Sequence, residues 1–202
     1  MPTSDEEHRV RSFEDLLVGV LVGGASSRMG GQPKGLLPVP GGRERIVPRL
    51  LRLTQEALPG AERVLLGRHV AYLDLGVSVL EDAMPGAGPL AGLVSLLRAA
   101  QASQKRHVLL LAGDLPRVSA DLLVRLAAFD ADVPAVAPTP DGFFEPLFAR
   151  YALTCLVDAE RALASDNRSL QALLRRLQAA SFPLTAEDRS LLVDWDEPAD
   201  IE

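Results

Sequence analysis

The sequence predicts a single-domain α/β fold with a mostly parallel sheet, and two patterns carry that prediction. Short, continuous apolar runs recur along the chain, and such runs are typical of strands that are covered on both faces. Between them lie stretches with apolar residues spaced i, i+3, i+4 and i+7, as in amphipathic helices. Strands that alternate with helices indicate parallel pairing through right-handed crossovers. The length of 202 residues fits one domain with a sizeable core.

The expected strands follow from the apolar runs. The first is Leu16–Val22, a run that ends in glycines. Four shorter runs resemble it: Arg63–Leu66, Val77–Leu80, His107–Leu111 and Val133–Ala137. We expect the less regular segment after Asp141 to add an antiparallel element and terminal helices.

The expected helices lie between these runs. One extends from Val47 to Leu58, and Pro48 fits its first turn. Ser119 is placed to cap a second helix. The remaining apolar faces are Leu90–Leu97, Leu122–Leu126, which follows Ser119, and Leu170–Leu177. Residues 1–15 are polar with little periodicity, so we expect a loosely held, flexible N-terminal extension before a domain that spans 16–202.

The composition excludes several classes of protein. With 21 Lys and Arg against 27 Asp and Glu, the net charge is −6, and no basic block suggests a nucleic-acid partner. The longest apolar stretch, Leu16–Ala25, is well short of the ~20 residues of a membrane span. The acidic N-terminus does not resemble a secretory signal. A single cysteine excludes a disulfide framework, so we expect a cytoplasmic protein.

Ligands of such folds bind outside the carboxyl ends of the strands, so the loops there are the candidate sites. The loop after the first expected strand is rich in glycine, and the amides of Gly23 and Gly24 can approach an anion closely. Arg28 and Lys34 add positive charge suited to a polyphosphate. The loop contains neither of the two commonest phosphate motifs, G-x-x-x-x-G-K-[ST] and G-x-G-x-x-G, nor the hydrolase motif G-x-S-x-G.

Two further loops carry polar groups. The segment Pro85–Gly92 opens a helix, and its N–H groups can face an anion or the polar edge of a base. The expected strand His107–Leu111 leads into Asp114, which is fixed by a following proline at Pro116. A carboxylate in this position can bind Mg²⁺ that also contacts substrate phosphates.

The order G-G-x-S-x-R-M-G-x-x-x-K in the first loop closely resembles the signature of the nucleotidyltransferases that make molybdenum cofactor dinucleotides. Val22 stands where that family usually has alanine. The resemblance spans roughly residues 16 to 200. It implies a Rossmann-like three-layer sandwich of the nucleotide-diphospho-sugar transferase type, with Mg²⁺ as cofactor.

The resemblance also implies roles for individual residues. Asp82 would contact the guanine or ribose of GTP, and Asp114 would be the magnesium ligand, with Asp196 supplying a second metal-coordinating oxygen. Arg28 and Lys34 would stabilise the departing pyrophosphate. The full nucleotide-binding set is Leu21, Val22, Gly23, Gly24, Lys34, Asp82, Gly88, Pro89, Leu90 and Asp114.

The chain departs from the family pattern at several positions. Gly113 replaces a cysteine, and Gly67 replaces an asparagine that commonly contacts the base. The segment Phe144–Tyr151 resembles a wall of the acceptor site, but Glu145 replaces glutamine and adds a negative charge there. Asp194 and Asp196 replace two asparagines near the C-terminus.

The implied reaction is transfer of GMP from GTP to the terminal phosphate of molybdopterin, with transient contacts to molybdoenzymes or cofactor-delivery proteins. One alternative is a cytidylyltransferase or sugar-phosphate nucleotidyltransferase, which Gly113 and the D-x-D-x-P ending favour. Another is a non-catalytic nucleotide-binding regulator, which the changes at Gly67, Glu145 and Asp194 keep open. A purely structural or interaction module is disfavoured by the polar loops at the strand ends.

Overall fold

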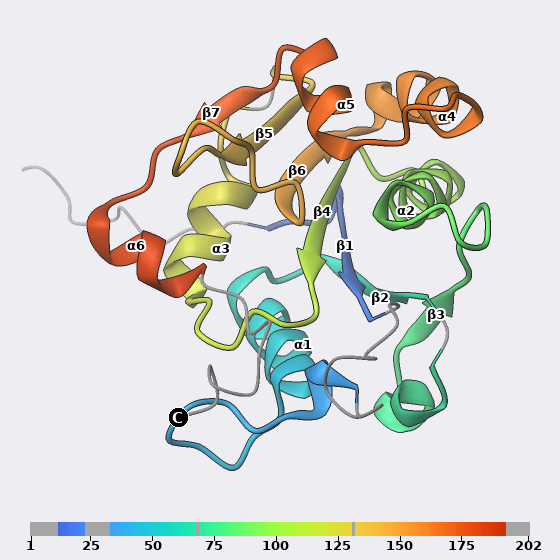
Figure 1. Ribbon diagram of the computed structural model, residues 1–202. Coiled ribbons are helices and arrows are strands. Elements are labelled where there is room, and N and C mark those ends of the chain that lie inside the picture. The colour runs from blue at the N-terminus through green and yellow to red at the C-terminus, as the bar shows by residue number, and fades with distance from the viewer. Residues whose placement is uncertain (1–11, 23–32, 68, 131, 193–202) are drawn as a thin grey trace, which may run out of the picture.

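The computed structural model describes residues 12–22, 33–67, 69–130 and 132–192. Its centre is a seven-stranded sheet of order β3-β2-β1-β4-β6-β5-β7 (Figure 1). All five expected strands are confirmed, with ends that differ by one or two residues. The strands are β1 (Leu16–Leu21), β2 (Glu62–Leu66), β3 (Ser78–Leu80), β4 (His107–Ala112), β5 (Ala135–Pro138), β6 (Phe148–Ala152) and β7 (Ala180–Phe182).

The sheet is parallel except at one strand. β1 pairs in parallel with β2 and β4, β2 with β3, and β5 with β7. β6 runs antiparallel to both of its neighbours, β4 and β5. It is the antiparallel element expected after Asp141, so the prediction of a mostly parallel sheet is confirmed.

The expected helices are also confirmed. Pro48 lies in the first turn of α1, and the Ser119 hydroxyl accepts a hydrogen bond of 3.2 Å from the Leu122 amide at the start of α3. Across the described ranges, no helix is both long and apolar enough to cross a membrane. The helices are α1 (Ile46–Ala57), α2 (Pro89–Ala102), α3 (Ala120–Ala127), α4 (Leu156–Ala164), α5 (Leu170–Arg176) and α6 (Ala186–Leu191), with short 3-10 turns η2 (Lys34–Leu36), η3 (Val70–Leu75) and η4 (Leu153–Cys155).

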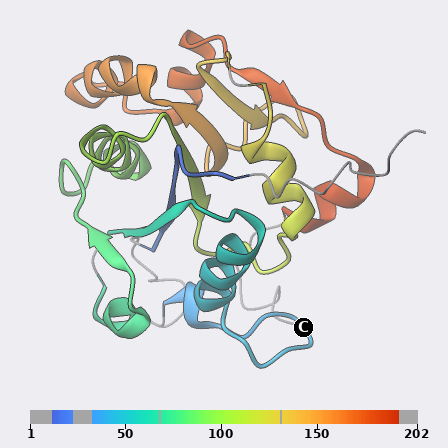
Figure 2. The ribbon, with the colours of Figure 1, turned by 180° about the vertical axis from the view of Figure 1, so that it is seen from behind.

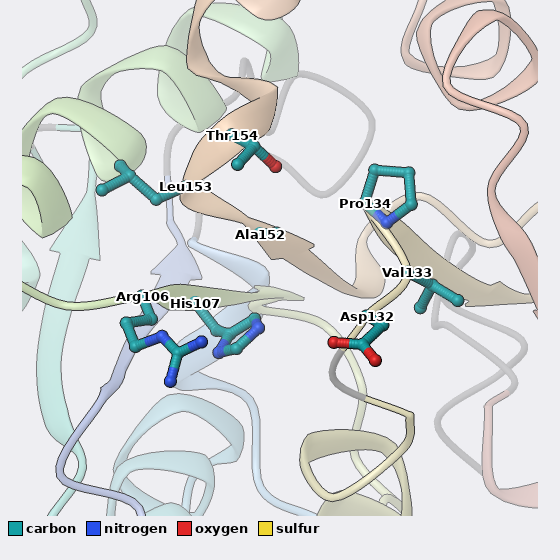
Figure 3. A pocket seen from close by; sticks show the side chains of 8 residues that line it. All are labelled: Arg106, His107, Asp132, Val133, Pro134, Ala152, Leu153 and Thr154. Carbon is teal, nitrogen blue, oxygen red and sulfur yellow. The ribbon is translucent and has the colours of Figure 1, made fainter.

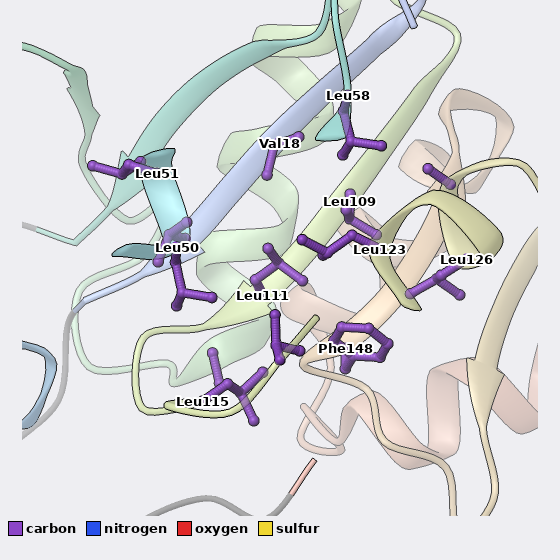
Figure 4. Close-up of a cluster of buried hydrophobic side chains, with 14 of the residues drawn as sticks. Val18, Leu50, Leu51, Leu58, Leu109, Leu111, Leu115, Leu123, Leu126 and Phe148 are labelled. Carbon is purple, nitrogen blue, oxygen red and sulfur yellow. The ribbon is translucent and has the colours of Figure 1, made fainter. Parts of the chain in front are cut away.

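Helices cover both faces of the sheet, which gives the expected three layers (Figure 2). Because side chains alternate along a strand, Val18 of β1 faces the layer of α1 and α3 while Leu17 faces that of α2, α4 and α5. Figure 4 shows the first of these two cores, in which Leu50 of α1 and Leu123 of α3 pack over Val18 and its neighbours on β4.

The segment before β1 is partly described. Phe13 is only 8% exposed and packs into the core, and its amide donates to the Pro59 carbonyl at 2.8 Å. The Asp15 carbonyl accepts from the amides of Arg106 and His107. Residues 1–11 lie outside the described residues, so a flexible extension over residues 1–15 stays a prediction.

The strand order locates the ligand side of the sheet. The chain proceeds from β1 through β2 to β3 at one edge, then crosses to the other side of β1 to form β4. This reversal in strand order lies between β1 and β4. In open α/β sheets the crevice at such a point, outside the carboxyl ends of the strands, is the usual ligand site.

Candidate active site

The ends of four neighbouring strands are tied to one another by backbone hydrogen bonds. The Val22 amide donates to the Leu66 carbonyl at 2.9 Å, and the Gly67 amide donates to the Leu80 carbonyl at 2.9 Å. On the other side of β1, the Gly113 amide donates to the Leu21 carbonyl at 3.0 Å. The loops that follow β1, β2, β3 and β4 therefore start from the same edge of the sheet.

Lys34 and Asp114 meet at this edge although 80 positions separate them in the sequence. Lys34 opens η2, and Asp114 lies two residues beyond the end of β4. The Lys34 Nζ lies 3.9 Å from the Asp114 Oδ2, and the side chains are 20% and 25% exposed. Because both side chains are partly buried, water screens their charges less than at an exposed surface. Lys34 can therefore attract a phosphate, and Asp114 a cation.

Two glycines allow the backbone beneath this pair to pack closely. A Cβ atom on Gly35 would lie 2.3 Å from the Val47 Cγ2 and 2.9 Å from the Gly113 carbonyl oxygen. A Cβ atom on Gly113 would lie 2.6 Å from the Leu21 carbonyl oxygen. Both contacts with backbone atoms are too short for any side chain. Steric crowding therefore explains why this chain has glycine at position 113.

Tyr72 is a site residue that the sequence analysis missed. It lies on η3, is 2% exposed, and its hydroxyl hydrogen-bonds with the backbone of Gly35. Burial and, to a smaller extent, the negative charge of Asp114 outweigh the opposing effect of the Gly35 hydrogen bond and raise the pKa of Tyr72 to about 12, so the hydroxyl stays neutral. The only signal was that Tyr72 is one of two tyrosines in the chain. Its contact with Gly35 positions the turn that carries Lys34.

Asp82 lies at the other side of the candidate site, two residues beyond β3. A Cβ atom added to Gly92 would lie 3.7 Å from the Asp82 Oδ1 and 3.1 Å from the Leu21 Cδ1. The Asp82 carboxylate thus packs against the first turns of α2, close to the end of β1. Burial raises the pKa of Asp82 above its ordinary value.

The first turn of α2 presents backbone donors on this side. Gly88 is the N-cap with φ +73°, Pro89 is the first helical residue, and no side chain caps the turn. Leu90 is fully buried and anchors the helix. The Ser95 hydroxyl donates to the Glu81 carbonyl at 2.7 Å and ties α2 to the Asp82 loop. A helix N-terminus of this kind favours an anion or a polar base edge.

A cavity of about 260 Å³ opens on the opposite side of Asp114. Glu145 lies in the turn before β6 and contributes the other acidic group of the lining. The complete lining is Ala112, Asp114, Leu115, Glu145, Pro146, Leu147, Phe148 and Leu192. This cavity, which we call the Glu145 pocket, lies where the sequence predicts the acceptor wall.

Five predicted or discussed positions, Gly23, Gly24, Arg28, Asp194 and Asp196, lie outside the described residues, and their roles stay predictions. Within the described ranges, no group of three or more His, Cys, Asp and Glu residues could hold a metal ion. Mg²⁺ in nucleotide enzymes is usually held by one or two carboxylates, water and substrate phosphates. A partly exposed Asp114 at a strand end fits that mode of binding.

A cavity of about 420 Å³ lies at the opposite end of the sheet (Figure 3). Arg106, His107 and Asp132 contribute its charged and polar groups, and Leu153 and Thr154 of η4 line it from the end of β6. His107 begins β4, whereas Asp114 follows its end. At ~3.3 Å per residue the two sites are roughly 20 Å apart, so this cavity does not take part in chemistry at Asp114.

Known proteins resemble this chain over nearly its whole length. A probable molybdenum cofactor guanylyltransferase from Opitutus terrae is 36% identical over 192 residues, which covers 91% of this chain and 92% of the relative. A molybdenum cofactor guanylyltransferase from Rhizobium johnstonii is 34% identical, with 86% of this chain and 82% of that protein covered.

A solved structure supports the same relationship. The molybdopterin-guanine dinucleotide biosynthesis protein A from Archaeoglobus fulgidus superimposes with a TM-score of 0.69 at 25% identity, covering 92% of this chain and 94% of its own. Residues 18–181 match the family described as the MobA-like NTP transferase domain. With most of its length matched in this way, the chain belongs to the MobA-like NTP transferase family.

Proposed function

We propose that this chain transfers GMP from GTP to the terminal phosphate of molybdopterin and releases pyrophosphate. The observation that carries the proposal is the approach of Lys34 and Asp114 to 3.9 Å at the reversal point of the sheet. This pair lies between a partly buried carboxylate, Asp82, on one side and the Glu145 pocket on the other. Relatives named molybdenum cofactor guanylyltransferases support the choice of both substrates.

The proposed step is a phosphoryl substitution at the α-phosphorus of GTP. An oxygen of the molybdopterin phosphate forms a new bond to that phosphorus, and the bond from the α-phosphorus to the bridging oxygen of the β-phosphate breaks. The electron pair of the broken bond leaves with pyrophosphate. Because the attacking oxygen is already anionic, the site needs no strong general base. It needs in-line alignment and compensation of negative charge.

The residues at the sheet edge are suited to those two tasks. Lys34, together with Arg28 and the amides of Gly23 and Gly24, would compensate charge on the departing pyrophosphate. Asp114, with Asp196, would hold Mg²⁺. When bound, Mg²⁺ would neutralise charge on the phosphates of the substrate.

The nucleoside end of GTP would lie on the Asp82 side. Three strand spacings of ~4.8 Å separate β3 from β4, which gives roughly 14 Å between the two strand ends. A nucleotide that lies across the strand ends would direct its base toward Asp82 and α2 and its phosphates toward Lys34 and Asp114. This arrangement leaves the Glu145 pocket for the acceptor.

The proposed setting is cytoplasmic. The product is a cofactor for other enzymes, so we expect transient contacts with molybdoenzymes or with delivery proteins. Neither nucleic acid nor membrane is an expected partner of a chain with net charge −6 and no basic block.

The test is incubation of the protein with molybdopterin, Mg²⁺ and either GTP or CTP, followed by mass identification of the product. We expect GTP to give the guanine dinucleotide and pyrophosphate, and GTP to raise the melting temperature more than CTP does. A cytosine product alone would instead establish a cytidylyltransferase. Tight GTP binding without pyrophosphate release would indicate a nucleotide-binding regulator. The steric reason for Gly113 weakens one of the two features that favoured CTP.

A further inference from the structure

Helix α1 supports both of the segments that meet at the candidate site. The Val47 Cγ2 would lie 2.3 Å from a Cβ atom on Gly35 and 3.3 Å from one on Gly113. Val47 therefore packs against the turn that carries Lys34 and against the start of the loop that carries Asp114. Because both segments rest on the same helix, a further contact from α1 to either of them helps to set the distance between Lys34 and Asp114.

Arg49, two residues further along α1, makes such a contact. Its Nη2 donates a hydrogen bond of 2.9 Å to the Val118 carbonyl. Val118 is fully buried and lies four residues beyond Asp114, immediately before Ser119, the N-cap of α3. The bond joins residues that are 69 positions apart, so it fixes the far end of the loop against α1.

The loop between β4 and α3 is thus anchored at both of its ends, and Asp114 lies between the anchors. At the near end, the Gly113 amide donates to the Leu21 carbonyl at 3.0 Å. Between the ends, Leu115 is 5% exposed and packs into the core. A carboxylate on a short loop that is already ordered loses little conformational entropy when a ligand binds.

Arg49 differs from Arg52, which lies three residues further along the same helix. The Arg52 guanidinium pairs at the surface with the carboxylates of Glu44 and Glu56. Both oxygens of Glu44 accept hydrogen bonds from Arg52, whereas Arg49 is bonded to a backbone carbonyl. The Arg49 Nη1 is buried and has no hydrogen-bond partner among the described residues. Because an unpaired buried donor costs free energy, its burial here indicates a role beyond stabilising the fold.

We propose that Arg49 is a positioning residue for Asp114. By holding the Val118 carbonyl, it keeps the loop after β4 in place, so that the Asp114 carboxylate stays 3.9 Å from the Lys34 ammonium group. The inference rests on the proposed function, in which these two charges are aligned with the reacting phosphates. Arg49 acts through the loop and does not contact the substrates. A misplacement of about 1 Å at such a site can cost up to ~10² in rate.

The first experiment compares the steady-state kinetics of Arg49→Met and Arg52→Met. Methionine keeps a long, unbranched side chain but has no N–H donor. We expect Arg49→Met to lower kcat about tenfold, because Asp114 is less well aligned, while the KM values for GTP and molybdopterin stay within about twofold. Arg52→Met is the matched control, because it breaks only surface ion pairs of the same helix, and it should leave kcat unchanged.

Thermal melting checks that both variants are folded. If Arg49→Met does not fold, Arg49→Gln gives the same comparison, because its shorter side chain also loses the bond to Val118. An unchanged kcat in the Arg49 variant, or an equal loss in Arg52→Met, would overturn the proposal.

The second experiment tests whether Arg49 acts through Asp114. In an Asp114→Asn background, Arg49→Met should lower kcat by less than about twofold, because the carboxylate that Arg49 positions is already gone. A further tenfold loss in the double variant would show that the two residues act independently, and the proposal would be wrong.

The third experiment requires neither substrates nor turnover. Hydrogen–deuterium exchange followed by mass spectrometry measures local opening of residues 113–123, whose hydrogen-bonded amides include those of Gly113 and Leu122. We expect this segment to exchange at least about threefold faster in Arg49→Met than in the wild type or in Arg52→Met. Equal exchange in all three proteins would refute the anchor. Should exchange change as expected while the wild type forms no dinucleotide from GTP, the proposed reaction fails and the anchoring of this loop by Arg49 stands.

Discussion

In the half of the sheet formed by β3, β2, β1 and β4, the site is shaped by backbone atoms that approach one another closely. Gly113 and Gly35 leave no space for a Cβ atom, and the strand ends are tied by amide-to-carbonyl bonds. In the half formed by β6, β5 and β7, the turn that carries Glu145 is held by two side chains, Gln171 and Tyr151, in addition to backbone hydrogen bonds of Glu145 with Pro138 and Phe148.

The difference suggests separate tolerances for change on the two sides. Where backbone atoms are in van der Waals contact, even a small substitution has a large effect on the structure, because any added atom must displace a strand end. Where side chains hold a turn by hydrogen bonds, a substitution has a smaller effect, because each bond contributes about 1 kcal/mol to stability and its loss loosens the turn without displacing the sheet. We therefore expect the nucleotide side of the site to be rigid and the acceptor side to be adjustable by substitution.

The largest expected effect is at the point where the two halves meet. Lys34→Ala and Asp114→Asn should each lower kcat by ~10²–10³, because each removes a charge aligned with the reacting phosphates. Both side chains are partly exposed, so both variants should stay folded by thermal melting. Pyrophosphate release with GTP, Mg²⁺ and molybdopterin is the measurement. Arg98→Ala is the control, because it breaks only an exposed ion pair with Glu160 on the helix layer. Near-normal turnover in either site variant would contradict the role assigned to that residue.

A smaller effect, confined to the nucleotide side, is expected at Asp82. Asp82→Asn should raise the KM for GTP about tenfold and leave the KM for molybdopterin unchanged, since a hydrogen bond to a charged acceptor is weakened. Burial raises the pKa of this carboxyl above the ordinary 3.8, so the charged form is lost at a higher pH than in an exposed aspartate. GTP binding by the wild type should therefore weaken as the pH falls toward that raised pKa. The variant should lack this titration, and an identical pH profile in both proteins would show that Asp82 does not contact the nucleotide.

A still smaller effect is expected on the acceptor side. Gln171→Leu should raise the KM for molybdopterin by roughly 3- to 10-fold and leave the KM for GTP unchanged, because Phe144 loses two hydrogen bonds next to Glu145. Gln101→Leu, at an exposed position near the end of α2, is a matched control. If the two KM values rose together, the two sides of the site would be mechanically coupled, and the comparison between the two halves would be wrong.

The parts of the fold that the sequence predicted are those set by local chemistry. The buried run at Leu16–Leu21 has no other stable place than a covered strand, and Ser119 caps its helix through a contact three residues away. The insertion of β6 between β4 and β5 was not predictable, because it depends on pairing between segments far apart in the chain. Arg150 illustrates the point: a charged residue inside β6 is buried because its guanidinium donates to the Phe129 and Asp130 carbonyls.

The candidate site divides in the same way. Asp82 and Asp114 follow strand-like runs, so their positions at strand ends could be read from the sequence, and Lys34 lies in the loop after the first such run. Tyr72 could not, because its role depends on contact with Gly35 across the fold. The hydrogen bonds between Gln171 and Phe144 join residues 27 positions apart, and no local sequence pattern predicts them.

The smallest effect on activity is expected at Asp188, which stabilises the far end of the acceptor half. Its carboxylate caps the first turn of α6 with Thr185 and pairs with Arg125, which also pairs with the exposed Asp121. Burial raises the pKa of Asp188, but hydrogen bonds from Thr185 and Arg125 outweigh burial, so the net pKa is lowered. Its contribution to stability is therefore present above pH 3.8 and is lost as the pH falls through the lowered folded-state pKa.

Asp188→Asn should accordingly lower the free energy of unfolding by ~1 kcal/mol at neutral pH, measured by urea denaturation, with both KM values unchanged. Asp121→Asn removes the other carboxylate from the same arginine, but it is 76% exposed and should lower stability by less than ~0.5 kcal/mol. The gap between the two variants should narrow as the pH falls below the ordinary carboxyl range. A raised KM for molybdopterin in Asp188→Asn would mean that α6, which ends beside Leu192 of the Glu145 pocket, helps to set the shape of the acceptor site.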